Sequence, residues 1–341
     1  MKATIKDIAS ACGVTPATVS LALSGKLKRV SPEKRKLIEE TAQRMHYTPN
    51  RAARSLATHA SKTIGVIMSD LRNTHLSAMF MALNEVVQAN GYSTLCHIVD
   101  DSEGATAYDA VREMLGAGVD GVFFAPPAVK SNGNERAIQL LMSANIPVVC
   151  NSDYGIAGFG ADVFFDFIEG GYLATKYLIE CGHSRIGCVS GPFQYQVTTQ
   201  RLDGYKRALE ESEIPFDAAL VYEGDYTIRG GVDALAYLLG QKATAIFSFN
   251  DEMAFGLYQS ARHYGVHIPE DISIIGCDNV PFSNVLNVPL STVNVPTETM
   301  GHLLADKLIA CIEEGDLSAA REVVWYKPDL ILRGSVRKIQ R

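Results

Sequence analysis

Beyond residue 61, short apolar runs alternate with amphipathic stretches, and this alternation restricts the possible folds more than any other feature of the chain. Apolar, β-branched runs predict buried strands, and apolar residues at helical spacing predict helices between them. Such regular alternation predicts parallel sheets covered by helices on both faces. The first series of strands is expected at residues 63–68, 93–98, 121–125 and 147–150, with helices at 76–90, 105–116 and 135–144.

A second series with the same rhythm begins after residue 180. Two similar series in one chain predict two similar lobes. Open parallel sheets bind ligands at the carboxyl ends of their strands, so two facing lobes predict a cleft between them. The strands of this series are expected at residues 185–190, 220–222, 244–248 and 272–276, and its helices at 200–212, 229–239 and 252–264.

The first 49 residues predict a separate, all-α unit. Thr4 can cap a first helix, with Asp7 at the capping-box position, and Gly13 can end it at positive φ. Thr15 and Ser31 each precede a proline, which is the start pattern of two further helices. Two helices joined by a turn that begins with glycine predict a helix-turn-helix, whose second helix enters the DNA major groove. The apolar residues expected to pack together include Ile5, Ile8, Ala9, Cys12, Leu37, Ile38, Ala42 and Met45.

Charge divides sharply along the chain. Residues 1–61 contain 11 Lys and Arg against 4 Asp and Glu, a net charge of about +7. The remainder contains 20 against 34, about −14, and the whole chain carries −7. A basic head on an acidic body indicates binding to nucleic acid at one end only.

The composition excludes other classes of protein. A chain of 341 residues can bury several cores, and none of its apolar runs reaches the length of a membrane span. No charged and apolar leader follows Met1, so we expect no secretion signal, no membrane partner and a cytoplasmic protein. The seven cysteines contain no C-x-x-C pattern and lie mostly in apolar runs, which predicts core residues in a reducing compartment.

An enzyme is the main alternative, because doubly wound sheets carry many enzymes. The chain lacks a Gly-x-Gly-x-x-Gly turn after its first strand, a Gly-x-x-x-x-Gly-Lys loop and a Gly-x-Ser-x-Gly elbow. An exported solute-binding protein, the second alternative, would need a leader and would lack the basic head. We therefore expect a non-enzymatic DNA-binding protein with no catalytic residues, no cofactor and no metal.

Two strings near the N-terminus are characteristic of a known family. They are Ile5-Lys-Asp-Ile-Ala with Gly13-Val-Thr-Pro-Ala-Thr-Val-Ser20, and Tyr47-x-Pro49-Asn50-Arg51-x-Ala53-x-x-Leu56. In these strings the chain resembles the lactose-repressor/galactose-repressor (LacI/GalR) family of bacterial transcription regulators, and the resemblance extends almost to Arg341. It implies a helix-turn-helix domain at residues 1–49, a hinge helix and linker at 50–61 and an effector-binding domain at 62–341.

The resemblance also implies an α/β effector-binding domain like the periplasmic binding proteins, with two lobes and parallel sheets. Its N-lobe would comprise about 62–163 and 294–323, and its C-lobe about 164–292 and 325–341. The chain would cross between lobes near Val163, Val293 and Val324. The matching landmarks are Asp166-x-x-x-Gly170-Gly171 before a helix, Gly182-His183 at its end, Gly191-Pro192 after the next strand and Asn250-Asp251 after a later one. We expect His183 to be structural, because it follows a predicted capping glycine.

The second helix of the head is implied to read DNA. In the family, the residues at the positions of Pro16, Ala17 and Leu21 contact bases, commonly through polar or basic side chains. This chain departs from that pattern, so the family does not indicate its operator sequence. Here all three are apolar and suit thymine methyl groups, or alternatively only cap or pack the helix. The hydroxyls that suit DNA phosphates are those of Thr15, Thr18, Ser20 and Ser24.

Residues 50–57 form the hinge segment by resemblance. Two helical turns are too short to be stable alone, so we expect them to be disordered off DNA and helical on it. Leu56 would be a wedge in the minor groove at the centre of a palindrome. Arg51 and Arg54 would lie near phosphates, and Asn50 would begin the segment.

The effector residues implied by the resemblance follow strands of both lobes. They are Asp70, Asn73, His75, Tyr195, Arg201, Tyr226, Asn250 and Asp278. The motifs around Arg201 and Asp278 are intact, although these two could also pair with each other without a ligand. An arginine, an asparagine and an aspartate beside aromatic rings suit a sugar ring with several hydroxyls. A nucleobase or nucleoside effector is the alternative.

A palindromic operator requires a two-fold dimer, and the family dimerises through both lobes. No leucine heptads follow the last strand-like run at residues 330–332, so we expect a homodimer and not a tetramer. The other expected partners are double-stranded operator DNA and a small effector. The sequence leaves open whether the effector releases the protein from DNA or promotes its binding.

Overall fold

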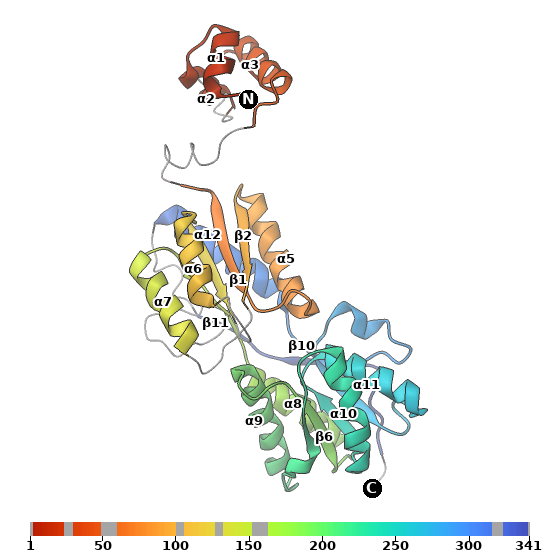
Figure 1. Ribbon diagram of the computed structural model, residues 1–341. Coiled ribbons are helices and arrows are strands. Elements are labelled where there is room, and N and C mark those ends of the chain that lie inside the picture. Colours follow the sequence, from red (N-terminus) through yellow and green to blue (C-terminus); the bar gives the residue numbers. More distant parts are fainter. Residues whose placement is uncertain are drawn as a thin grey trace. The chain divides into compact units, whose positions relative to one another are not determined.

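The computed structural model has two compact units, Met1–Ser61 and Lys62–Arg341, which we call the head and the body (Figure 1). Within the part of the chain that the structure describes, no helix is both long and apolar enough to cross a bilayer. The described residues are 3–23, 30–48, 60–99, 106–126, 132–151, 163–315 and 323–339.

The head is a small bundle of helices α1 (Ile5–Cys12), α2 (Pro16–Leu23) and α3 (Pro32–Arg44). Ile8, Val19 and Ile38, one from each helix, are fully buried and form the centre of its core. Leu37 was expected in this core but is 48% exposed. The buried face of α3 runs through Ile38, Thr41 and Ala42, at the spacing of one helix face, and Leu37 lies outside it.

The helix ends of the head follow the sequence signals. The side chains of Thr4 and Asp7 each accept a bond from the other residue's backbone N–H, at 3.4 and 2.8 Å, so the capping box is present. Gly13 ends α1 at φ +63°, and Ser31 caps α3. Local chemistry therefore defines these three helix ends.

The body begins with a four-stranded parallel sheet in the order β2-β1-β3-β4. Ile64, Val66 and Met68 of β1 share a core with α5 and α12, whereas Ile67 lies in a second core with α6 and α7. Helices therefore cover both faces of this sheet, and we call the assembly the N-lobe (Figure 1). Its elements are β1 (Thr63–Met68), β2 (Ser93–Ile98), β3 (Gly121–Ala125), β4 (Val148–Val149), α5 (Thr74–Ala89), α6 (Ala107–Gly116), α7 (Asn132–Ala144) and α12 (Thr297–Glu314).

A six-stranded sheet in the order β12-β10-β9-β8-β6-β7 forms the C-lobe. The edge strand β12 is antiparallel to β10, and the other pairings are parallel. Helix α8 packs on α9, and α10 packs on α11. The elements are β6 (Ile186–Ser190), β7 (Val221–Glu223), β8 (Ala245–Ser248), β9 (Ser273–Asp278), β10 (Ser291–Asn294), β12 (Asp329–Ile331), α8 (Phe167–Glu180), α9 (Gln196–Glu211), α10 (Ile228–Gly240), α11 (Asp251–Tyr264) and the 3₁₀ turns η1 (Ala218–Leu220) and η2 (Pro281–Asn284).

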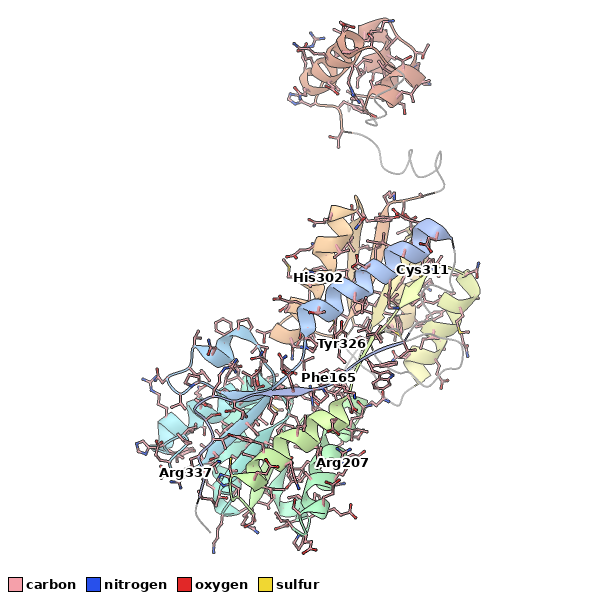
Figure 2. The ribbon with its side chains drawn as sticks, turned by 180° about the vertical axis from the view of Figure 1, so that it is seen from behind. Phe165, Arg207, His302, Cys311, Tyr326 and Arg337 are labelled. Carbon is pink, nitrogen blue, oxygen red and sulfur yellow. The ribbon has the colours of Figure 1, made fainter. Side chains whose placement is uncertain are left out.

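Two further strands, β5 (Val163–Phe165) and β11 (Val324–Tyr326), pair in parallel as a separate ribbon. Phe165 and Tyr326, labelled in Figure 2, are partners in its register. Phe164 stacks on Trp325 with ring centroids 4.7 Å apart, and Trp325 is 61% exposed. The ribbon leads into α8 and β12 of the C-lobe, and the chain passes from β10 to α12 of the N-lobe.

Three elements differ from the predicted pattern for physical reasons. Helix α9 begins at Gln196, four residues before the predicted start, because burial of Thr198 outweighs the weak helix propensity of this β-branched stretch. Gly170 and Gly171 were expected before a helix but lie inside α8, where a Cβ at Gly171 would overlap the Arg201 carbonyl oxygen of α9. The antiparallel β12 departs from an all-parallel sheet, and it does so at the sheet edge, where an otherwise parallel sheet commonly carries an antiparallel strand.

Helix α12 is missing from the predicted elements, although its signal is present. Met300, Leu304 and Leu308 are buried and recur every four residues. This is the spacing of one helix face. The predicted helix end at Gly182 is confirmed, since Gly182 follows α8 at φ +96°.

Candidate functional site

The face of α2 that was predicted to read DNA is open to solvent. Pro16, Ala17 and Ser20 are exposed, whereas Val19 and Ala22 of the same helix are buried in the head core. The exposed residues lie on one side of the helix because their spacing differs from that of the buried pair. This surface can therefore meet a groove without disturbing the core.

The remaining residues predicted for DNA binding have different positions. Thr15 and Thr18 lie at the start of α2, with their hydroxyls 2.9 Å apart, and Thr15 Oγ1 accepts the Thr18 N–H at 3.2 Å. Leu21 is partly buried. Ser24, Asn50, Arg51, Arg54 and Leu56 lie outside the described residues, so the hinge stays a prediction.

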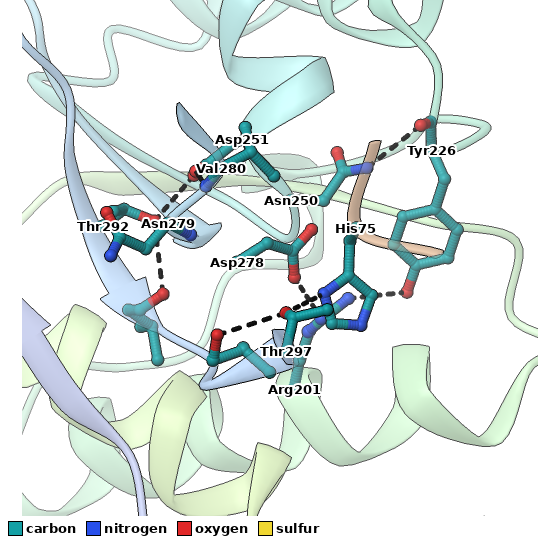
Figure 3. A network of polar contacts seen from close by, with 12 residues as sticks. His75, Arg201, Tyr226, Asn250, Asp251, Asp278, Asn279, Val280, Thr292 and Thr297 are labelled. Atoms are coloured by element: carbon teal, nitrogen blue, oxygen red, sulfur yellow. Dashed lines mark hydrogen bonds and ion pairs between the residues drawn. The ribbon is translucent and has the colours of Figure 1, made fainter. Parts of the chain in front are cut away.

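The body contains a network of polar side chains, drawn in Figure 3. Its members come from the starts of α5, α11 and α12, from α9 and β10, from the segment before α10 and from the end of β9. The network brings together five predicted effector residues, which are His75, Arg201, Tyr226, Asn250 and Asp278.

Arg201 and Asp278 form the centre of this network. Arg201 Nη2 lies 3.1 Å from Asp278 Oδ1, and the side chains are only 6% and 5% exposed. The guanidinium carbon lies 4.5 Å from the centroid of the Phe167 ring. Arg201 Nε is buried without a hydrogen-bond partner among the described residues. The pairing predicted as an alternative is thus present, and one donor of the arginine is left for a further polar group.

The backbone at Asp278 is strained, with φ +119°, and the next residue, Asn279, has φ +55°. Non-glycine residues rarely adopt such angles, and surrounding contacts must hold them. Asp251 supplies such contacts. It accepts bonds from Val280 N at 3.0 Å and from the hydroxyls of Ser283 and Thr292 at 2.6 Å each.

Burial alters the acid–base chemistry of these carboxyl groups. It raises the pKa of Asp278 to about 7 against the opposing charge of Arg201. The pKa of Asp251 rises to about 7 for the same reason, with a further contribution from Asp278, while three hydrogen bonds to Asp251 oppose the rise. The two acids therefore titrate close to neutral pH.

Tyr226 is held at positive φ, +63°, beside the ion pair. Its carbonyl oxygen accepts a 3.0 Å bond from Asn250 Nδ2, and Asn250 Oδ1 caps α11 through Met253 N at 2.9 Å. Its hydroxyl lies 2.7 Å from Thr198 Oγ1 and 3.5 Å from Arg201 Nη1. A Cβ at Gly191 would overlap the Tyr226 ring, so glycine is required there.

The N-lobe contributes His75 to the site. Its Nδ1 lies 2.7 Å from the hydroxyl of Thr297 at the start of α12. Burial, aided by the charge of Arg201, lowers the pKa of His75 to about 4. The imidazole is therefore neutral at neutral pH.

The other three predicted effector residues lie before helices α5 and α9. Asp70 pairs with Arg72, Oδ1 to Nε 3.0 Å, and Asn73 caps α5 by accepting the Leu76 N–H at 3.1 Å. Tyr195 precedes α9, with its ring centroid 6.3 Å from that of Tyr226. The short side chains of Asp and Asn commonly bond to nearby backbone in this way.

Sequence reasoning missed several residues of the network. They are Thr198, Asp251, Glu252, Thr292 and Thr297. Asp251 had a signal, since it belongs to the Asn250-Asp251 landmark after a strand. The prediction for His183 is confirmed, because its ring nitrogens lie 3.0 Å from Thr244 Oγ1 and 3.2 Å from the Arg337 carbonyl oxygen.

The chemistry of the network favours an organic ligand. No group of three or more His, Cys, Asp or Glu that could hold a metal ion occurs among the described residues. Arginine and aspartate can bind neighbouring hydroxyls in pairs, and the rings of Phe167, Tyr195 and Tyr226 lie nearby.

Comparison with known proteins gives concordant matches for both units. Residues 4–50 match the family model described as "Bacterial regulatory proteins, lacI family", and residues 175–336 match "Periplasmic binding protein-like domain". The HTH-type transcriptional repressor PurR of Vibrio atlanticus (strain LGP32) is 33% identical over 342 residues, which cover 99% of each chain.

Solved structures show the same fold. The lac repressor dimer bound to operator and the anti-inducer ONPF has a TM-score of 0.84 at 24% identity, covering 99% of this chain and 100% of that one. A LacI family transcriptional regulator from Enterococcus faecalis V583 with bound ribose has a TM-score of 0.72 at 28% identity, covering 82% and 100%.

Proposed function

The chain belongs to the LacI family of bacterial regulatory proteins and is a DNA-binding transcriptional repressor, and from this premise we propose that a small sugar bound in the body controls its binding to operator DNA. The observation that carries the proposal is the buried Arg201–Asp278 pair with aromatic rings beside it. A sugar offers paired hydroxyls to the two charged groups and an apolar ring face to the aromatics.

The charges of the site favour an uncharged effector. Asp278 already pairs with Arg201, and His75 is neutral at neutral pH. A phosphorylated sugar would bring negative charge close to Asp251 and Asp278, and like charges at short range in a buried site are costly. The bound ribose in the regulator from Enterococcus faecalis V583 supports a neutral sugar for this chain as well.

A nucleobase or nucleoside is the second candidate. Tyr226 and Tyr195 place two aromatic rings near Arg201, and Phe167 adds a third. A flat base can stack on such rings while its edge binds polar groups. The similarity to the repressor PurR keeps this candidate beside the sugar.

For the DNA complex, we propose that two copies bind a palindromic operator as a homodimer. Support comes from the exposed Pro16, Ala17 and Ser20 on α2 and from the lac repressor, which was solved as a dimer on its operator. Apolar contacts of Pro16, Ala17 and Leu21 with thymine methyls would contribute specificity. The hinge with Leu56 as its wedge belongs to the same proposal.

A thermal-shift screen of the purified full chain against neutral sugars, sugar phosphates and nucleosides tests the effector. A ligand at 100 times its dissociation constant stabilises the folded protein by roughly 2.7 kcal/mol. We expect a neutral sugar to raise Tm and to change the affinity for an operator fragment. A shift with nucleosides alone would favour the second candidate, and shifts with sugar phosphates alone would contradict both.

A further inference from the structure

Glu252, in the C-lobe, contacts the first turn of an N-lobe helix. Its Oε1 accepts a 2.8 Å bond from the backbone N–H of Thr74 and a 3.0 Å bond from the Thr74 hydroxyl. The two residues are 178 positions apart in the sequence. Both hydrogen bonds are partly buried, so water screens them less than it would screen a surface contact.

The amino end of α5, which Glu252 contacts, needs a hydrogen-bond acceptor. Thr74 is the first residue of α5, so its N–H has no partner within the helix. The N-cap Asn73 satisfies the N–H of Leu76 instead. A carboxylate at this position completes the cap and interacts favourably with the positive end of the helix dipole.

Glu252 also lies in the first turn of its own helix, α11. Its charge is thus shared by the amino ends of two helices, one from each lobe. If the lobes separated, Glu252 would remain at α11, but α5 would lose its acceptor. The contact therefore lowers the free energy of the arrangement in which the two helix ends meet.

The same turn of α5 carries the N-lobe part of the candidate effector site. His75 follows Thr74 directly and belongs to the network in Figure 3, where the charge of Arg201 acts on its imidazole. We infer that Glu252 is a positioning residue of the effector site, which acts through Thr74 to hold His75 against the Arg201–Asp278 pair. Its role in regulation rests on the proposed function, but the contact can be tested without any effector.

The test compares Glu252→Ala and Glu252→Gln in the full chain. Hydrogen exchange measures the protection of the Thr74 amide, and NMR of ¹³C-labelled histidine, assigned with His75→Asn, measures the pKa of His75. In Glu252→Ala we expect the Thr74 amide to exchange roughly tenfold faster. In the wild type the local opening that exposes this amide must break a charged hydrogen bond, and in the variant it need not. We also expect the pKa of His75 to rise from about 4 toward its ordinary 6.5.

Glu252→Gln retains an oxygen that can accept both bonds, so it should preserve most of the protection and the low pKa of His75. Glu298→Ala is the matched control, because Glu298 is an exposed glutamate in the first turn of α12. It should change neither readout. If Glu252→Ala folds poorly, Thr74→Val, which removes only the hydroxyl donor, should give a smaller change in the same direction.

The inference is overturned if Glu252→Ala leaves the His75 pKa at about 4, or if Glu298→Ala shifts both readouts equally. A structural role alone would lower Tm without moving the His75 titration selectively. If both readouts change as expected while no sugar or nucleoside raises Tm, the proposed effector fails and the contact stands. If a sugar binds but the readouts do not move, only the role of Glu252 fails.

Discussion

At the scale of single residues, the carboxyl group of Asp251 connects folding to pH. Burial, together with the charge of Asp278, raises its pKa to about 7 from an ordinary 3.8. Between these values the folded protein retains a proton that the unfolded chain has released. The stabilisation due to this proton is complete below the unfolded pKa and is lost as the pH rises through the folded pKa.

Asp251→Asn removes this titration, and asparagine can still accept the bonds from Val280 N and Ser283 Oγ through its amide oxygen. From about pH 5 to about pH 8 we expect the wild-type protein to lose stability relative to the variant, by up to roughly 1.4 kcal/mol per pH unit. Urea denaturation across this range measures it. Asp271 is an exposed acid with a lowered pKa, so the plot of unfolding free energy against pH for Asp271→Asn should run parallel to that of the wild type. Parallel curves for Asp251→Asn would contradict the raised pKa.

At the scale of elements, glycines let α8 and α9 approach closely. A Cβ at Gly171 would overlap the carbonyl oxygen of Arg201, and one at Gly204 would overlap that of Ile168. This approach brings Phe167, at the start of α8, under the guanidinium group of Arg201 on α9. The spacing of two helices thus sets the contact between Phe167 and Arg201 in the candidate effector site.

Gly171→Ala should therefore destabilise the body by about 2 kcal/mol or more, because backbone must move to admit the methyl group. Gly240→Ala is the matched control, since Gly240 ends α10 and a Cβ added there would meet no atom within 4 Å. It should be neutral or stabilise by up to about 1 kcal/mol. Chemical denaturation of both variants measures the difference, and equal stabilities would show that α8 and α9 can separate at little cost.

Elements with strong local signals could be predicted from the sequence, and contacts between distant elements could not. The bounds of β1, β2 and β3 agree with the prediction, and the signal is strongest for β1 and β3, which are short, almost wholly buried apolar runs. Arg201 and Asp278 meet as expected for residues at the ligand-binding edge of a parallel sheet. The bond between Glu252 and Thr74 has no sequence signature, because neither residue is part of a periodic pattern and 178 positions separate them.

At the scale of the whole molecule, the candidate effector residues and the residues proposed to read DNA lie in different units of the chain. Communication between two such sites is a shared free energy, typically about 1–3 kcal/mol, and is reciprocal. The effector can contribute this energy only by binding one arrangement of the lobes better than another. A substitution of Asp278, at the end of β9, is our proposed way to remove this preference.

We expect Asp278→Ala to abolish the response to the sugar found in the screen, while the affinity for operator without sugar stays within about threefold, or roughly 0.7 kcal/mol. Truncation leaves Arg201 buried without its carboxylate, which can cost about 3 kcal/mol of stability. Asp278→Asn, which keeps an acceptor, is the milder second variant. Operator titrations with and without the sugar measure the effect, and a full response in both variants would remove Asp278 from the site.

The stacked rings of the β5–β11 ribbon have a practical consequence. Trp325 is the single tryptophan of the sequence. In the ribbon that leads into the C-lobe, its indole stacks on the Phe164 ring and remains 61% exposed to solvent. We expect rotation of one lobe against the other to twist this ribbon and to change how the indole overlaps the Phe164 ring. The emission wavelength of unlabelled protein, and its quenching by iodide, therefore report the twist directly. Stopped-flow fluorescence can then time the motion of the lobes separately from the release of DNA.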